Sequence, residues 1–208
     1  MNQTISFFLF FSTLLLFNSC KDSPAKELPI LGHKSMVNGD QEYHTIPDWK
    51  YATQDNIDLT NKDLSNVIYV ADFFFISCPS ICPKVMKEMT KIYKEFENIP
   101  GIKLVSFTLD PKRDTPEKLK AYAQKLGVSN DKWIFLHTDK ESIYDLAAKY
   151  FVPAYEDKNV PGGFDHSGKI ILVDHDGHVR SFSEGTDASN TPKLIKDIKT
   201  LLKEYETK

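Results

Sequence analysis

The chain has 208 residues, with 26 basic and 29 acidic side chains, a formal net charge of −3 and a mean hydropathy of −0.36. This composition indicates one soluble domain with a single hydrophobic core and gives no reason to expect a second domain. No basic stripe runs through the sequence, so neither nucleic acid nor an anionic membrane surface bound through charge is expected as a partner. The three cysteines, Cys20, Cys78 and Cys82, are too few for a scaffold held together by disulfides.

The first 20 residues contain no charged side chain, and residues 5–17 are nearly all apolar. This run is shorter than the ~20 residues that a membrane-spanning helix needs, and it fits the apolar region of a secretory signal. Ser19 followed by Cys20 resembles the lipobox of bacterial lipoproteins, so we expect residues 1–19 to be a signal peptide and Cys20 to carry the lipid. An ordinary signal peptide and an uncleaved anchor are the alternatives. All three place the domain outside the cytoplasm, and the lipoprotein hypothesis places it in the bacterial cell envelope, anchored to a membrane and facing the periplasm.

Residues 20–43 are polar and without sustained periodicity, which predicts a tether and an irregular lead-in to a folded domain at residues 44–208. An almost continuous apolar run at 67–76 predicts a strand buried on both faces. The next elements alternate between helix and strand. They are a helix from Pro83 that ends near Pro100, a strand at 102–109, a helix that begins with Thr115-Pro116 and ends at Gly127, and a strand at 133–137.

A capping box at Thr138-Asp139-Lys140-Glu141 predicts the start of a third helix, and a long irregular stretch follows at 153–167. Residues 169–173 and 178–183 then predict a hairpin around Asp176-Gly177, and Thr191-Pro192 starts a final helix. This order predicts an α/β fold whose central mixed sheet is parallel in its first part and antiparallel at one edge, with helices on both faces. A thioredoxin-like domain has this arrangement.

The most specific signal is Ser77-Cys78-Pro79-Ser80-Ile81-Cys82-Pro83, between the first buried strand and the first helix. Pro83 suits the first helical position, which puts Cys82 at a helix N-terminus, where free N–H groups favour thiolate over thiol. With three residues between them, the two sulfurs can close a small disulfide or converge on one metal ion. A purely structural disulfide is the less favoured reading, because so short a loop stabilises by only about 2 kcal/mol.

Two thiolates leave a metal ion under-coordinated, so a third ligand is needed. His166 lies just before the strand at 169–173, and in thioredoxin-like domains the loop at this place faces the cysteine motif and normally carries a proline. We therefore predict His166 as the third ligand, and we expect His175 and His178 to be solvated turn residues. Asp110 ends the second strand, where it either orients a metal ligand or caps a turn. The nearby Asp114 is expected to cap a helix.

Three motifs together resemble those of the Sco/SenC family of copper proteins: Cys78-Pro-Ser-Ile-Cys82-Pro, Leu-Asp110-Pro-Lys-Arg-Asp114-Thr-Pro, and Asp165-His166-Ser. The resemblance spans about residues 46–202. It implies that Cys78, Cys82 and His166 bind copper, and that the protein helps to assemble the dinuclear copper centre of cytochrome c oxidase. Residues 72–77 depart from the Gly-Tyr/Phe-Thr pattern of many members, which affects packing around the site and leaves the expected ligands in place.

The chemistry of the three expected ligands agrees with copper binding, since two thiolates and an imidazole suit Cu(I). With an added oxygen ligand the same set would suit Cu(II). Zinc also accepts such ligands. The main hypothesis is a membrane-tethered copper metallochaperone that is not an enzyme and that passes copper to the copper-site subunit of cytochrome c oxidase or to another copper protein. The alternative is an enzyme, a thiol-disulfide oxidoreductase with Cys78 and Cys82 as its redox-active dithiol. It would keep the cysteines of a copper-site target reduced, and it needs a thiol reductant partner. A peroxidase of the same fold is a third, weaker hypothesis.

Overall fold

The computed structural model describes residues 27–206, so Cys20 and the expected signal peptide lie outside the described residues. The described chain folds around a seven-stranded sheet in the order β11-β10-β5-β6-β7-β3-β4. Within this part of the chain, no helix combines the length and the apolar character needed to cross a membrane.

The centre of the sheet is parallel and both of its sides are antiparallel. Strands β5 (Ile68–Phe74), β6 (Ile102–Thr108) and β7 (Trp133–His137) form the parallel centre. On one side lie β10 (Lys169–Val173) and β11 (Val179–Glu184), and on the other lie β3 (Lys50–Thr53) and β4 (Asp58–Thr60). The predicted α/β, thioredoxin-like fold with a mixed central sheet is confirmed. The expectation of antiparallel strands at one edge only was wrong, because β3 and β4 are too short to give a clear apolar pattern.

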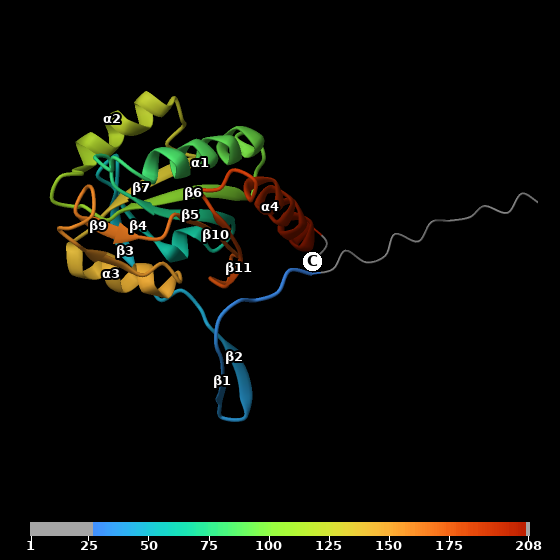
Figure 1. The fold of residues 1–208 in the computed structure, drawn as a ribbon. Coiled ribbons are helices and arrows are strands. Elements are labelled where there is room, and N and C mark those ends of the chain that lie inside the picture. Colours follow the sequence, from blue (N-terminus) through green and yellow to red (C-terminus); the bar gives the residue numbers. More distant parts are fainter. Residues whose placement is uncertain (1–26, 207–208) are drawn as a thin grey trace, which may run out of the picture.

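Helices cover both faces of the sheet, as predicted (Figure 1). Helices α1 (Cys82–Phe96), α2 (Pro116–Leu126) and α4 (Thr191–Glu206) pack on one face, where Val85, Met89, Ile92 and Phe96 of α1 form the expected apolar stripe. Helix α3 (Lys140–Lys149) and the short 3-10 helix η1 (Asn61–Leu64) pack on the other face. Each face therefore has its own hydrophobic core.

The helix ends follow the predicted signals with one exception. Thr115 is the N-cap of α2, and Gly127 ends that helix in the left-handed conformation with φ of 70°. For α3, the N-cap is Asp139 and not the predicted Thr138. The Asp139 carboxylate accepts a hydrogen bond from the Ser142 amide at 2.9 Å, which satisfies one of the free donors of the first turn.

Two short hairpins occupy segments that we expected to be irregular. Strands β1 (Lys34–Val37) and β2 (Asp40–Tyr43) pair across Asn38-Gly39, both with positive φ, and project from the body of the domain (Figure 1). All eight residues of these strands are exposed, so no alternation of apolar side chains announces them. Strands β8 (Ala154–Glu156) and β9 (Phe164–His166) pair within the stretch 153–167. The second hairpin matters for function because β9 ends at His166.

Candidate metal centre

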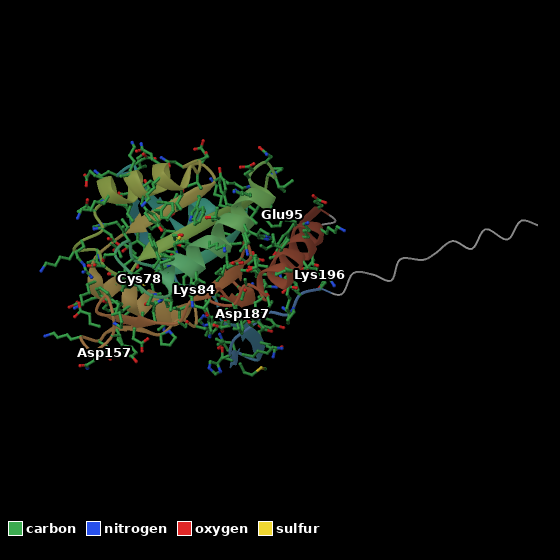
Figure 2. The ribbon with its side chains drawn as sticks, turned by 45° about the horizontal axis from the view of Figure 1, so that its top comes forward. Cys78, Lys84, Glu95, Asp157, Asp187 and Lys196 are labelled. Atoms are coloured by element: carbon green, nitrogen blue, oxygen red, sulfur yellow. The ribbon has the colours of Figure 1, made fainter. Side chains whose placement is uncertain are left out.

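Cys78, Cys82 and His166 meet at one end of the domain. Their ligand atoms all lie within 4.8 Å of one another, and the Cys82 Sγ is 3.7 Å from His166 Nε2. All three side chains are buried, with 4–7% of each residue exposed. Figure 2 shows Cys78 near Lys84 at the start of α1, while Glu95 and Lys196 lie toward the opposite end. The structure thus brings together three residues that the sequence separates by up to 88 positions.

The two cysteines lie where the chain passes from β5 into α1. The Cys78 amide donates to the Phe75 carbonyl at 3.2 Å, which turns the chain back after the strand. Helix α1 begins at Cys82, so Pro83 is its second residue and not its first. Both cysteines are free thiols, and the Cys82 amide donates to Cys78 Sγ at 3.4 Å. An amide of the first helical turn, which has no acceptor within the helix, therefore donates a hydrogen bond to the sulfur of Cys78.

The electrostatics of the two sulfurs differ. Burial acts to raise the pKa of Cys78, but hydrogen bonds from His166, the Cys82 side chain and the Cys82 amide outweigh it and lower this pKa to about 6. Burial raises the pKa of Cys82 well above its ordinary value, and the neighbouring Cys78 raises it further. The sequence predicted the thiolate at Cys82. The structure assigns it to Cys78 instead, because the helix-terminal amide points to Cys78.

His166 is oriented by its own turn and by an aromatic neighbour. Its Nδ1 lies 3.1 Å from the Ser167 carbonyl, which can only accept a hydrogen bond, so Nδ1 carries a proton and Nε2 faces the sulfurs. The ring of Phe75 meets the imidazole edge-on, with 6.1 Å between centroids. In a neutral imidazole, Nε2 then offers its lone pair to a metal ion, and in an imidazolium Nε2 donates to the sulfurs. Two sulfurs and this nitrogen form a soft ligand set that suits Cu(I).

Asp114 holds the segment that leads to Cys78. Its buried Oδ2 accepts hydrogen bonds from the Ile76 amide at 3.0 Å and from the Thr108 hydroxyl at 2.7 Å. We expected this residue to cap a helix, and that expectation was wrong, since Thr115 occupies the cap position of α2. Asp114 instead fixes the backbone two residues before the first cysteine.

Arg113 holds the segment that carries His166. Its Nη2 donates to the Gly162 carbonyl at 3.1 Å, and its guanidinium lies 5.7 Å from the centre of the Phe164 ring. Asp110 pairs with Arg113 Nε and also accepts the Arg113 amide at 3.3 Å, which caps this turn. Among the described residues, Asp110 has no hydrogen bond to either cysteine or to His166. Residues 110–115, which we call the bridging loop, therefore contact both ligand-bearing segments.

Gly162 is one of the places where the cysteine-bearing and histidine-bearing segments touch. Its φ is +91°, and a Cβ on this residue would lie 2.8 Å from the Phe75 ring and 3.1 Å from Pro79. Only glycine allows this approach without displacing a neighbour. Sequence reasoning missed the roles of Arg113, Asp114 and Gly162. The available signals were the bridging-loop motif itself and the Gly162-Gly163 pair.

A second group of possible ligand residues is formed by Asp174, Asp176 and His178. Asp174 already accepts hydrogen bonds from Arg180 Nη1 at 3.1 Å and lies 3.3 Å from His178 Nδ1, so protein groups occupy its Oδ2. His178 is thus not the solvated turn residue that we expected. The cluster joins β10, the turn and β11, and it offers little free capacity for a metal ion.

Comparisons with known proteins agree on one family. The SCO1/SenC family model matches residues 37–203. The chain is similar to a SCO1/SenC family lipoprotein from Bacillus anthracis, with 28% identity, a TM-score of 0.70 and coverage of 76% of this chain and 95% of that one.

Two further structures are similar. One is BsSco, described as a Sco family cytochrome c oxidase assembly protein with a disulfide switch, at 28% identity, a TM-score of 0.66 and coverage of 76% and 93%. The other is Arabidopsis thaliana ScoI with copper bound, at 25% identity, a TM-score of 0.61 and coverage of 74% and 97%. The family model covers well over half of the sequence, and the motif residues converge in space. The chain therefore belongs to the SCO1/SenC family.

Proposed function

We propose that this protein is a membrane-tethered copper metallochaperone. Copper is its cargo, held by Cys78, Cys82 and His166 and passed on to the copper-site subunit of cytochrome c oxidase or to another copper protein. The convergence of two sulfurs and one imidazole nitrogen within 4.8 Å carries the proposal. Three soft ligands hold Cu(I) and leave it open to attack by an incoming ligand of the recipient, so transfer proceeds by ligand exchange.

Similar proteins support both parts of this function. The Arabidopsis thaliana relative binds copper, and BsSco is placed among the cytochrome c oxidase assembly proteins. The chemistry of the site agrees, because the Cys78 pKa of about 6 leaves one thiolate ready at neutral pH, and metal binding requires deprotonated sulfur. Copper and the cytochrome c oxidase recipient are therefore the cargo and partner that we propose.

A copper titration tests the site. The reduced full-length chain in detergent should bind one Cu(I) per molecule in competition with a chromophoric Cu(I) chelator. Cys78→Ser and Cys82→Ser should abolish binding at that competitor strength, and His166→Ala should weaken it at least about tenfold, which corresponds to about 1.4 kcal/mol. His33→Ala is the matched control, because His33 is exposed and far from the cysteines in sequence. Unchanged affinity in His166→Ala would remove the histidine from the ligand set.

We also propose that acylation of Cys20 anchors the domain to a membrane of the bacterial cell envelope, on its periplasmic side. A similar protein of known structure is a lipoprotein, and the uncharged run before Cys20 has the length of a secretory signal. In bacteria fed an alkyne-tagged fatty acid, the chain should acquire the tag, and Cys20→Ser should not. A tagged Cys20→Ser protein would contradict this assignment.

A thiol-disulfide oxidoreductase is the second candidate function. It is favoured by the two adjacent free thiols, one of them with a lowered pKa, and by the disulfide switch described for BsSco. In that role Cys78 attacks a target disulfide, Cys82 resolves the mixed disulfide, and a thiol partner reduces the pair again. Trapping of a target by Cys82→Ser that persists in the His166→Ala background would favour this function, since disulfide exchange needs no bound copper.

A further inference from the structure

The exposed surfaces of α1 and α4 are made almost entirely of lysine. Each helix repeats its lysines every three or four residues, which is the spacing that places side chains on one face. The opposite face of each helix packs into the core. We call the exposed surface of the two helices the lysine face. Apart from one proline and one glutamate on each helix, all of its exposed residues are lysines, namely Lys84, Lys87, Lys91 and Lys94 on α1 and Lys193, Lys196, Lys199 and Lys203 on α4.

The two helices lie side by side and run in the same direction. The Thr191 hydroxyl at the start of α4 donates to the Glu88 carboxylate of α1 at 2.6 Å. Eight residues later on α4, Lys199 pairs with Glu95, which lies seven residues after Glu88 on α1. Because both helices cover the same face of the sheet, their lysines form two parallel rows on one outer surface (Figure 1).

The lysine face extends from the metal centre to the point where the chain enters the domain. At one end, Lys84 lies two residues after Cys82, and Figure 2 shows it near Cys78. At the other end, Glu204 of α4 accepts a hydrogen bond from the Leu28 amide at 2.7 Å. Seven residues of chain lead from Cys20 to Glu27, which limits their separation to about 25 Å. The face therefore lies between the metal centre and the lipid anchor that we propose.

The charge of the lysine face is opposite to that of the whole chain. Helices α1 and α4 together carry eight lysines and five carboxylates, a net charge of +3, whereas the chain carries −3. Like charges at this spacing on a helix repel each other, and α3 avoids this by mixing lysines and carboxylates on its exposed surface. Within the described part of the chain, four lysines of the face have no side-chain hydrogen bond or ion pair, namely Lys84, Lys87, Lys94 and Lys196.

No basic stripe is visible in the sequence, because apolar residues separate these lysines along the chain. The expectation that no anionic membrane surface is bound through charge did not allow for the packing of α1 beside α4. Only the fold brings the two rows of lysines together.

A partner of the lysine face must be anionic, and the composition of the face favours a membrane over a protein. Protein interfaces are centred on aromatic, methionine and arginine side chains and are depleted in lysine. None of those three kinds of residue is exposed on α1 or α4. Lysine carries a compact charge on a flexible stem, so it needs no fixed partner geometry and suits a fluid layer of lipid phosphates.

We infer that the lysine face docks on the anionic lipid headgroups of the membrane to which the domain is tethered. This inference rests on the proposed anchor at Cys20 and is independent of the copper cargo. Each lysine near an anionic surface favours the docked orientation by about fivefold, so four unpaired lysines hold the domain on the membrane. A lipid anchor and a basic surface together are the two signals that bind a protein firmly to a membrane. Docking holds the metal centre, at the start of α1, close to the membrane surface and within reach of a recipient in the same membrane.

Lysine footprinting in lipid nanodiscs tests this docking. The full-length chain, purified from bacterial membranes in detergent, is inserted into nanodiscs of phosphatidylcholine alone or of phosphatidylcholine and phosphatidylglycerol in equal parts. Reductive methylation with formaldehyde, an uncharged reagent, followed by peptide mass spectrometry gives the labelling rate of each lysine. The four unpaired lysines should be labelled at least about fivefold more slowly in the anionic nanodiscs. About 0.5 M NaCl should remove the difference, because it shortens the screening length to about 4 Å. Lys149, exposed on α3, should be labelled equally in both.

Two variants with equal charge separate the lysine face from charge in general. In the first, the four unpaired lysines are replaced by Lys84→Gln, Lys87→Gln, Lys94→Gln and Lys196→Gln. The labelling rates of Lys91 and Lys199, which remain on the face, should then agree within about twofold between the two kinds of nanodisc. In the control variant these two lysines should stay protected in the anionic nanodiscs. The control carries glutamine at four exposed lysines outside the face, namely Lys112, Lys125, Lys149 and Lys158.

The possible outcomes distinguish this inference from the proposed function. Equal labelling of the lysine face in both kinds of nanodisc would overturn the inference and leave the proposed anchor in place. A chain that does not stay in the nanodiscs would overturn the anchor and the inference together. Protection in native bacterial membranes without protection in anionic nanodiscs would assign the face to an acidic protein and overturn the inference. The copper titration is a separate measurement that none of these results changes.

Discussion

The two ligand-bearing segments of this site are held in different ways. The cysteine segment, residues 75–82, runs directly from the central strand β5 into α1, and hydrogen bonds inside the core fix its backbone. The histidine segment, residues 153–168, forms the small β8–β9 sheet outside the main sheet, and its last residue, Gly168, accepts a hydrogen bond from the Gly185 amide at 2.8 Å. It meets the rest of the site through Arg113, Phe75 and the close approach of Gly162.

The two segments should therefore differ in how rigidly they hold their ligands. We expect a segment anchored in the core to keep the two sulfurs at a constant distance, and a segment held by a few contacts to let the imidazole adjust when the proposed copper cargo binds or is released. Loss of a contact on the cysteine side should therefore reduce the stability of the whole domain. Loss of a contact on the histidine side should reduce copper affinity and leave stability nearly unchanged.

The largest effect is expected on the cysteine side, from the pH dependence of stability at Asp72. Its pKa is raised from 3.8 to about 7 by burial, so the stability that Asp72 contributes is fully present below pH 3.8 and is lost as pH rises toward 7. The full loss is up to about 4 kcal/mol. Asp72→Asn should remove this slope. Urea denaturation of both reduced proteins from pH 5 to pH 8 measures the difference, and parallel pH profiles would contradict it.

Asp114→Ala should cost the domain about 3 kcal/mol of unfolding free energy, because it leaves the partly buried Ile76 amide and the buried Thr108 hydroxyl without their acceptor. Asp139→Ala serves as the control, since Asp139 also accepts a backbone amide but lies at the surface. That cap should cost about 1 kcal/mol. Equal losses in the two variants, measured by urea denaturation, would show that the cysteine segment is not anchored through Asp114.

Gly162→Ala should lower Cu(I) affinity about 100-fold, or about 2.7 kcal/mol, because the added Cβ pushes the histidine segment away from Phe75 and Pro79. Gly163→Ala controls for backbone strain. Its φ is also positive, at +86°, but a Cβ there meets nothing within 4 Å. Competition with a Cu(I) chelator gives both affinities. The comparison of the two segments fails if the Gly163 variant loses as much affinity as the Gly162 variant.

Arg113→Lys should give the smallest effect, a loss of Cu(I) affinity of about fivefold, or about 1 kcal/mol. Lysine keeps a positive charge beside Asp110 but cannot also reach the Gly162 carbonyl and cover the Phe164 ring with a planar group. Lys112→Ala, at an exposed neighbouring position, should bind copper like the wild type. A drop in thermal stability without a change in affinity would place Arg113 among the structural contacts instead.

The cysteine half of the site could be predicted from the sequence because its signals are local. A buried strand, two cysteines and a proline occupy adjacent positions, and their order alone places the sulfurs at a helix start. The choice of thiolate could not be predicted, since it depends on the direction of one amide hydrogen bond, from Cys82 to Cys78.

The histidine half of the site could be predicted only by first predicting the fold. His166 follows no local signal, and the prediction depended on the loop that a thioredoxin-like domain places opposite its cysteines. The contacts of Arg113 and Asp114 join residues 38 to 49 positions apart, and no pattern in one sequence records such pairs. The hairpin of β1 and β2 could have been predicted, because Asn38-Gly39 is a recognised turn signal. It was missed because its strands show no alternation of apolar side chains.

The bridging loop has a consequence for how this site can vary among sequences. Because Arg113 and Asp114 are adjacent, a shift of one peptide unit changes the support of the imidazole and of the sulfurs at the same time. An insertion or deletion here cannot be compensated on one side alone. Variation should therefore accumulate in the exposed parts of 157–163, while the spacing between residues 110 and 114 stays constant wherever the metal is kept.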